Sequence, residues 1–292
     1  MSKPKAKFNY VKQITLEELQ AKYTDFFQFK FEDGIMELKM HSDGGHVRWS
    51  TQMHNALGEV WTDIGHAKWI ECLIITCADP YWILADETDP GSWAEMEQSE
   101  DMHLRYDVQI YDTLKLVENF VNDIEIPTIA AINGRGIHWE MGIMSDITLC
   151  TPDFIFQDDH FGMQTGMVPG DSQTMVMQMV LGIKRSNYMS LTCKGLNAQE
   201  CLDLGVVNEI VERDKIVDRA WEIARKYIMT RDRSVRRMTH FICVRKWREF
   251  VEQDLRIHVL SEMYSFNLSG VSHNFNYIDY EGDSYAEKIE KE

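Results

Sequence analysis

Two segments of the chain gather residues that can accept and donate protons. The segment 126–152 reads IPTIAAINGRGIHWEMGIMSDITLCTP and contains His138, and the segment 156–173 reads FQDDHFGMQTGMVPGDSQ and contains His160 and Asp171. The ordinary pKa of an imidazole is about 6.5, so much of it is neutral and can act as a base at pH 7. A carboxylate beside the ring orients it and stabilises its charged form. These segments therefore predict a site of acid–base chemistry.

Other chemistries lack their sequence patterns. There is no GxSxG turn for a serine nucleophile and no GxxxxGK[ST] loop for phosphate. His41, His46 and His54 lie close together but form no HExxH pattern, so we expect no metal ligands, with a zinc site built from scattered histidines as an alternative. The six cysteines form no CxxC pair and are expected in the core: Cys72, Cys77, Cys150, Cys193, Cys201 and Cys243.

Composition excludes several classes of protein. The 292 residues are 44% apolar, which is enough for a sizeable core. With 30 basic and 47 acidic residues the net charge is −17, which argues against a nucleic-acid partner. No stretch of roughly 18 apolar residues predicts a membrane span, and the N-terminus lacks the apolar segment of a secretory signal. We therefore expect a cytoplasmic protein with reduced cysteines.

The first half of the chain predicts strands joined by a helix. Residues 26–41 alternate apolar and polar side chains around Asp33-Gly34, which indicates a β-hairpin. The apolar runs 69–78 and 126–133 predict buried strands, and apolar residues recur at helical spacing over 104–124 between them. A strand, a helix and a strand at this spacing imply a right-handed parallel crossover.

The second half predicts short strands followed by helices. A helix is expected from Asn197, with Glu200 completing a capping box, to Gly205. Residues from about 214 onward read as helical. The expected parts are an N-terminal extension over 1–25, an α/β core over 26–212, a helical region over 213–270 and a polar tail over 271–292.

Four motifs in order resemble the crotonase, or enoyl-CoA hydratase/isomerase, superfamily. They are IPTIAAING, SDITL, GMVPG and CLDLGVVNEIV, and the resemblance covers residues 26–268. It implies an α/β fold of the crotonase type, which is a ββα spiral with a helical C-terminal part. It also implies a homotrimer or a dimer of trimers, with the last helices covering the core or a neighbouring subunit.

The chain departs from the hydratases of that superfamily at the thioester site. The hydratases have a glycine-rich turn where this chain has 135–139, and the counterpart of their second oxyanion segment, 85–89, has no glycine. Residues 86–104 hold seven carboxylates and no Lys or Arg, which suits coenzyme A poorly. Glu140 matches one catalytic glutamate of the hydratases, and the second is absent.

The pattern is most similar to one branch, the 6-oxocamphor hydrolase type of β-diketone hydrolase. That branch cleaves a carbon–carbon bond between two ketones by a retro-Claisen reaction, without coenzyme A or metal. The matching residues are Trp49, His54, His138, His160, Asp171 and Glu262. Five residues separate His160 from Gly166, where the branch has three.

The resemblance implies a role for each matching residue. His160 would be the base, Asp171 would orient it, and Glu262 would extend the chain. His138 and the Trp49 indole would hydrogen-bond the second carbonyl, with His54 assisting. The substrate would be a small neutral diketone in an aromatic pocket, and no cofactor is expected. Further pocket residues are Trp82, Trp139, Phe161 and Glu140, while Asp158 and Asp159 are expected to be turn or surface residues.

Three other functions stay open from the sequence. The first is an acyl-CoA hydratase, isomerase or thioester hydrolase that uses Glu140. The second is a binding protein or scaffold that has lost catalysis. The third is a metallohydrolase that uses the histidines.

Overall fold

The computed structural model describes residues 11–84, 99–162 and 166–269. The predicted polar tail, the acidic segment 86–98 and the glycine-free segment 85–89 lie outside these ranges. Within 11–26, α1 (Leu16–Lys22) is capped by Thr15 and buries Leu19 against the core. No helix in the described ranges is long and apolar enough to cross a membrane.

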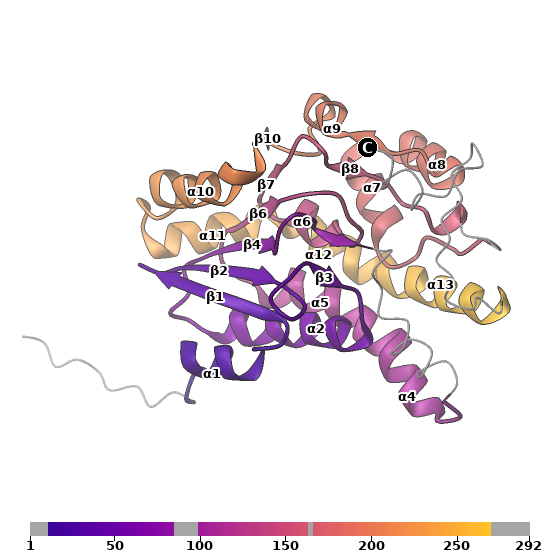
Figure 1. The fold of residues 1–292 in the computed structure, drawn as a ribbon, viewed down its shortest axis with the longest axis horizontal. Helices are drawn as coiled ribbons and strands as arrows, with labels where there is room; N and C mark the ends of the chain where they lie inside the picture. The colour runs from indigo at the N-terminus through magenta and orange to yellow at the C-terminus, as the bar shows by residue number, and fades with distance from the viewer. Residues whose placement is uncertain (1–10, 85–98, 163–165, 270–292) are drawn as a thin grey trace, which may run out of the picture.

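A six-stranded sheet forms the centre of the molecule (Figure 1). Its order is β1 (Phe27–Glu32), β2 (Ile35–Met40), β4 (Cys72–Cys77), β6 (Thr128–Ile132), β7 (Ile147–Cys150) and β10 (Glu209–Ile210). The predicted hairpin is confirmed: β1 and β2 pair antiparallel, and Asp33 and Gly34 both have positive φ. The other neighbouring strands pair in parallel. This is the mixed α/β fold that the motifs predict.

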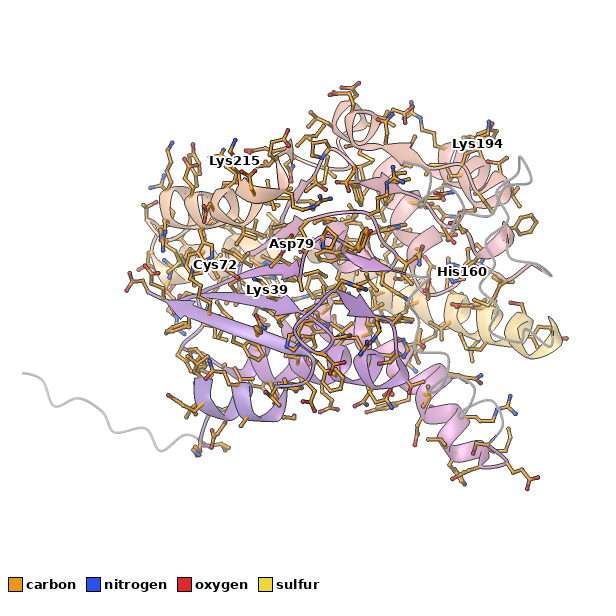
Figure 2. All side chains as sticks on the ribbon, viewed as in Figure 1. Lys39, Cys72, Asp79, His160, Lys194 and Lys215 are labelled. Atoms are coloured by element: carbon orange, nitrogen blue, oxygen red, sulfur yellow. The ribbon has the colours of Figure 1, made fainter. Side chains whose placement is uncertain are left out.

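Both faces of the sheet are covered, because alternate residues of its buried strands point to opposite sides. On one face Leu73 and Ile75 of β4 join the large core formed with α2 (Thr51–His66) and α5 (Thr113–Asp123). On the other face Cys72 and Ile74 pack with residues of α10 (Arg213–Ile223). Figure 2 labels Cys72 within the strands, well away from His160.

The single helix expected over 104–124 is interrupted. The chain forms α4 (Met102–Tyr106), a π-helical turn η1 (Asp107–Asp112) and then α5. The wider π turn changes the direction of the following side chains, and Tyr111, which the spacing places on the apolar face, is 46% exposed. Leu104 is also exposed whereas Val108 is buried, so the expected apolar face is wrong at Leu104 and Tyr111.

Shorter elements connect the sheet to the helical part of the chain. They are β3 (Val47–Arg48), β5 (Ile83–Leu84), α6 (Glu140–Met144), β8 (Ile155–Phe156), η2 (His160–Gly162), α7 (Gln173–Leu181), α8 (Ile183–Thr192), β9 (Leu196–Asn197) and α9 (Ala198–Leu204). The capping box of Asn197 and Glu200 is confirmed, and Gly205 ends α9 with φ 75°.

The last part of the described chain is helical, as the sequence predicts. It comprises η3 (Ala224–Ile228), α11 (Arg233–Cys243), α12 (Arg245–Phe250), η4 (Val251–Leu255) and α13 (Arg256–Ser269). One expectation about the cysteines is wrong, because Cys243 on α11 is exposed while the other five are buried. Figure 1 shows α13 extending past α7 toward the end of the molecule that holds η2.

Candidate active site

The loop after β6 reaches the site because two glycines let it pass close to another segment. A Cβ at Gly134 would lie 2.2 Å from the carbonyl oxygen of Pro80, and one at Gly136 would lie 2.4 Å from that of Ile83. The amide of Ile137 donates to the Ile83 carbonyl at 2.6 Å. Any larger residue at either glycine would force the two segments apart, so these glycines fix where His138, two residues after Gly136, lies.

His138 is buried and held from several sides. Its φ is +51°, a left-handed conformation that is uncommon outside glycine, and its carbonyl accepts from the Trp82 indole at 3.0 Å. Its ring Nδ1 lies 2.9 Å from Oε1 of Glu140, the first residue of α6. Burial lowers the pKa of His138, but the charge of Glu140 and its hydrogen bond outweigh this, so the pKa lies above its usual value. The raised pKa favours the protonated ring, in which Nδ1–H donates to Oε1 of Glu140.

Two further aromatic rings complete this wall of the site. Trp49 stacks on His138 with ring centroids 3.9 Å apart, and it meets His54 edge to face at 5.2 Å. Ser50, which directly follows Trp49, caps α2 by accepting from the Met53 amide. This cap fixes Trp49 relative to His54, which lies in α2. Burial lowers the pKa of His54 to about 3, so its imidazole is neutral at pH 7. The predicted grouping of Trp49, His54 and His138 is present.

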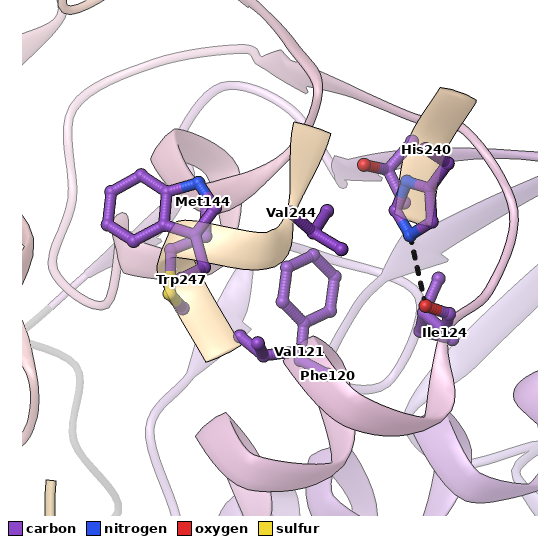
Figure 3. Close-up of a pocket in the computed structure, with 8 residues that line it drawn as sticks. Phe120, Val121, Ile124, Met144, His240, Val244 and Trp247 are labelled. Atoms are coloured by element: carbon purple, nitrogen blue, oxygen red, sulfur yellow. Dashed lines mark hydrogen bonds between the residues drawn. The ribbon is translucent and has the colours of Figure 1, made fainter. Parts of the chain in front are cut away.

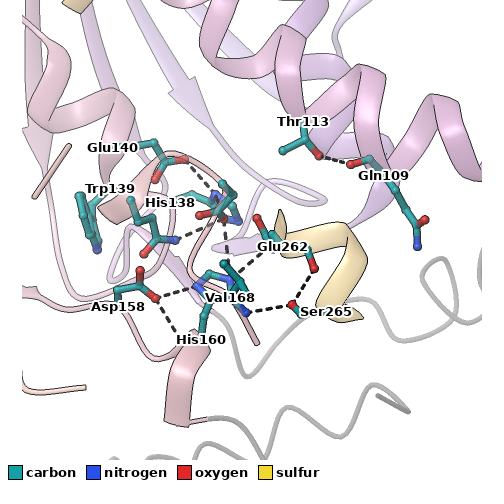
Figure 4. A network of polar contacts seen from close by, with 12 residues as sticks. Gln109, Thr113, His138, Trp139, Glu140, Asp158, His160, Val168, Glu262 and Ser265 are labelled. Carbon is teal, nitrogen blue, oxygen red and sulfur yellow. Dashed lines mark hydrogen bonds and ion pairs between the residues drawn. The ribbon is translucent and has the colours of Figure 1, made fainter. Parts of the chain in front are cut away.

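His160 is oriented by Asp158. Oδ1 of Asp158 lies 2.7 Å from Nδ1 of His160 and also accepts from the His160 amide at 3.0 Å (Figure 4). Asp158 is only 2% exposed, so the expectation that it is a turn or surface residue is wrong in its burial. The orienting contact predicted for Asp171 is made by Asp158 instead.

Asp171 lies between the two histidines. Its Oδ2 is 3.7 Å from Nδ1 of His138 and 3.9 Å from Nε2 of His160. Oε1 of Glu262, on α13, is 3.7 Å from the same Nε2. Four residues predicted as catalytic from distant parts of the chain, His138, His160, Asp171 and Glu262, are therefore brought together.

The glycine of the VPGD motif allows α13 to supply Glu262. A Cβ at Gly170 would lie 2.3 Å from the carbonyl oxygen of His258 and 2.6 Å from Cβ of Glu262. The same loop is fastened to the helix where the Val168 amide donates to Ser265 Oγ at 2.9 Å. Close approach of backbone to backbone places Glu262 opposite Asp171, which the spacing of residues in the sequence does not reveal.

The cluster holds more acid than base. Four buried carboxyl groups, on Glu140, Asp158, Asp171 and Glu262, face two imidazoles, and in the described ranges none of the four pairs with Lys or Arg. Burial and the charge of Asp171 raise the pKa of Glu262 well above its usual value. Burial also raises the pKa of Glu140, with His138 opposing. The site can thus hold a carboxylic acid beside a base.

The surroundings of His160 raise its pKa. Burial lowers its pKa, but the charges of Asp158 and Asp171 more than offset this, so the pKa lies well above 6.5. Its Nε2, directed at Asp171 and Glu262, is the atom through which it can exchange a proton with a molecule in the site.

The other predicted pocket residues differ in exposure. Trp139 is fully buried against Phe156, and its indole donates to the Gln157 carbonyl at 2.8 Å. Trp82 is also fully buried and supports the His138 carbonyl. Phe161, next to His160, is 45% exposed. Substrate contacts of Trp139, Phe161 and Glu140 stay predictions.

A metal site built from His41, His46 and His54 is not formed in the described ranges. Nδ1 of His41 instead accepts from the Gly44 amide, and His54 lies against Trp49. Within these ranges, the group with metal-ligand spacing is His160, Asp171 and Glu262, whose ligand atoms lie within 4.8 Å of one another.

The profile of the enoyl-CoA hydratase/isomerase family matches residues 30–263. The chain belongs to that family. A curated relative, the fatty acid oxidation complex subunit alpha of Shewanella frigidimarina, is 26% identical over 200 residues, which is 67% of this chain. The aligned part is only 27% of that relative, so the chain spans about a quarter of its length.

Solved structures of the family share the fold. A β-diketone hydrolase from the cyanobacterium Anabaena sp. PCC 7120, bound to (S)-3-oxocyclohexyl acetic acid, is 27% identical with a TM-score of 0.77, covering 88% of this chain and 96% of that one. An enoyl-CoA hydratase/isomerase from Mycobacterium paratuberculosis is 20% identical with a TM-score of 0.75, covering 85% and 96%. The similarity to this enoyl-CoA hydratase/isomerase concerns the fold alone.

The functional residue that sequence reasoning missed is Asp158. Its signal was local: an aspartate two residues before a histidine can accept from the backbone amide of that histidine in an Asx turn. Such a turn places the carboxylate beside the same residue's ring, as it does here.

Proposed function

We propose that this family member is a hydrolase that cleaves a carbon–carbon bond of a cyclic or bicyclic β-diketone by a retro-Claisen reaction, without coenzyme A or metal. The observation that carries the proposal is the position of Asp171 between the buried imidazole of His138 and the half-buried imidazole of His160, at 3.7 Å and 3.9 Å. The similarity to the cyanobacterial β-diketone hydrolase supports the same assignment.

The reaction begins with water. Nε2 of His160 accepts a proton from the water as its oxygen bonds to one carbonyl carbon, and Asp158 on Nδ1 stabilises the imidazolium. The product of this step is a tetrahedral alkoxide. When it collapses, the bond to the central carbon breaks, and the electron pair of that bond forms an enolate with the second carbonyl.

The enolate needs a donor for its oxygen and a proton for its carbon. His138, with its pKa raised beside Glu140, is the donor to the oxygen, and the stacked Trp49 holds its ring in place. The proton taken up by His160 is returned to the enolate carbon, with Glu262 in reach of the same nitrogen to relay it. The products are one carboxylic acid group and one ketone.

A second function keeps support from the family itself. An acyl-CoA hydratase, isomerase or thioester hydrolase would use Glu140, which begins α6 fully buried. Against it, Oε1 of Glu140 is engaged by His138, whose side chain stands in the turn where hydratases present glycine amides.

The test follows ultraviolet enol absorbance for a panel of cyclic 1,3-diketones, with EDTA present. Wild type should consume at least one diketone, and His160→Ala should lose about 10²–10⁴ of the rate because it removes the base. Glu140→Gln should lower diketone turnover less than His160→Ala does, because Glu140 acts only through His138. Absence of turnover on every diketone, together with acyl-CoA hydration that Glu140→Gln abolishes, would instead establish the second function.

We also propose that the protein assembles as a homotrimer or a dimer of trimers through α11. Its residues Val235, Met238 and Ile242 are 54%, 62% and 69% exposed and recur at helical spacing, while His240 anchors the opposite side. Light scattering should give three or six chains for wild type and fewer for Met238→Glu. A monomer at all concentrations would contradict this.

A further inference from the structure

We propose that His160, Asp171 and Glu262 form a binding site for a zinc-class divalent cation, and that occupancy of this site inhibits the enzyme. The binding claim stands on the side-chain cluster alone. The inhibition claim rests on the proposed function, because zinc would occupy the nitrogen that activates water.

The three side chains have the spacing that one ion requires. Nε2 of His160 lies 3.9 Å from Oδ2 of Asp171 and 3.7 Å from Oε1 of Glu262, and all three ligand atoms lie within 4.8 Å of one another. Zinc binds nitrogen and carboxylate oxygen at about 2.0–2.2 Å, so shifts of a few tenths of an ångström bring the three atoms onto one ion. Three protein ligands leave a fourth position open.

The other ring nitrogen of His160, Nδ1, contacts a carboxylate, as is usual for histidines in protein metal sites. A histidine that binds a metal through one nitrogen usually donates its other N–H to a carboxylate, which fixes the ring and its tautomer. Asp158 makes this contact with Nδ1 at 2.7 Å and is 2% exposed. Nε2 is therefore the nitrogen directed at Asp171 and Glu262.

Unpartnered oxygens in the cluster point independently to a cation. Within the described ranges, Oδ1 of Asp171 and Oε2 of Glu262 are buried without a hydrogen-bond partner, and these residues are 6% and 4% exposed. Buried carboxylate oxygens normally have a partner, and a bound cation is one that satisfies several of them together. The neighbouring carboxyl groups of Glu140 and Asp158 each have one further unpartnered oxygen.

The mixed donor set favours zinc over magnesium. Zinc accepts an imidazole nitrogen with carboxylates in a four-coordinate site, whereas magnesium demands oxygen ligands and keeps several of its waters. In this cluster an imidazole nitrogen is one of the three ligand atoms, and magnesium does not favour nitrogen.

The test measures zinc binding to the full chain, after the chain has been treated with a chelator and the chelator has been removed. Isothermal titration with ZnCl₂ and anomalous diffraction at the zinc edge should give one ion among His160, Asp171 and Glu262. His160→Ala and Glu262→Gln should abolish or weaken that site, and Asp158→Asn should weaken it roughly 10- to 100-fold. MgCl₂ should give no binding.

His103→Asn is the matched control, since this histidine is exposed on α4 and should leave the site unchanged. Anomalous density elsewhere, equal zinc binding by wild type and His160→Ala, or equal binding of magnesium would overturn the proposal. If the protein binds zinc at this site but consumes no diketone when it is free of zinc, the binding claim stands and the proposed function is rejected. Diketone turnover unaffected by bound zinc would reject inhibition alone.

Discussion

Oδ1 of Asp158 holds both the ring and the backbone of His160, at 2.7 Å from Nδ1 and 3.0 Å from the amide nitrogen. Nε2 of His160 faces Asp171 and Glu262, and Asp171 lies between His160 and His138. In the proposed catalytic cluster, His160 and His138 share the carboxylate of Asp171. Asp158 is a further partner of His160, and Glu140 is a further partner of His138.

Replacing Asp158 by Asn should exchange the carboxylate that fixes the tautomer of His160 for a neutral amide, whose NH2 group can donate to Nδ1 and favour the other tautomer. We expect kcat on the diketone to fall about 10²- to 10⁴-fold with little change in KM, as in hydrolase triads whose aspartate is replaced. Steady-state kinetics measure this. Asp159→Asn is the control one residue away and should stay close to wild type; equal effects of both changes would contradict the orienting role.

The pH profile should report the raised pKa of His160. Below that pKa the imidazolium cannot accept a proton from water, so kcat/KM should rise with pH and have its acid midpoint above 6.5. Asp158→Asn removes a negative charge that raises this pKa, so the midpoint should move down. A profile that is flat between pH 5 and 8 in both proteins would reject His160 as the base.

Gly170→Ala should disturb the contact between the loop and α13. The added Cβ would lie 2.3 Å from the His258 carbonyl, and such overpacking typically costs about 1–3 kcal/mol. Denaturant unfolding should show that loss, with activity falling because Glu262 is displaced. Gly45→Ala meets only the Ser42 carbonyl, at 3.6 Å, and should be nearly neutral.

His240 fastens α11 to the core and should matter for stability. Its Nδ1 lies 2.7 Å from Asp146 Oδ2 and its Nε2 lies 3.0 Å from the Ile124 carbonyl, beside a small apolar pocket (Figure 3). His240→Ala leaves the half-buried carboxylate of Asp146 with fewer partners and should cost roughly 2–4 kcal/mol.

Urea unfolding measures this loss, with the exposed Cys243→Ser on the same helix as the control. Activity per folded molecule should be unchanged, because His240 lies outside the catalytic cluster. If the His240→Ala protein is as stable as wild type, the two contacts of His240 make no net contribution to the free energy of unfolding.

The sequence predicted those parts of the fold and site that local patterns encode. Alternation around Asp33-Gly34 located the hairpin, and the motifs brought His138, His160, Asp171 and Glu262 into one hypothesis. Local spacing did not reveal the π turn at 107–112, because a π turn changes the register of side chains without interrupting an apolar pattern.

The role of Asp158 was missed for a different reason. An aspartate in a polar turn is usually solvated, and its burial here depends on segments distant in the sequence. In the same way, the contact of Gly170 with α13 joins residues about ninety positions apart, so only the folded chain shows why that glycine is needed.

The most direct test of the central claim is the product formed from a cyclic 1,3-diketone in H₂¹⁸O by protein treated with EDTA. The account predicts a ring-opened keto acid carrying one ¹⁸O in its carboxyl group, formed by wild type and lost with His160→Ala. An intact diketone in every reaction, with acyl-CoA hydrated by wild type but not by Glu140→Gln, would contradict it.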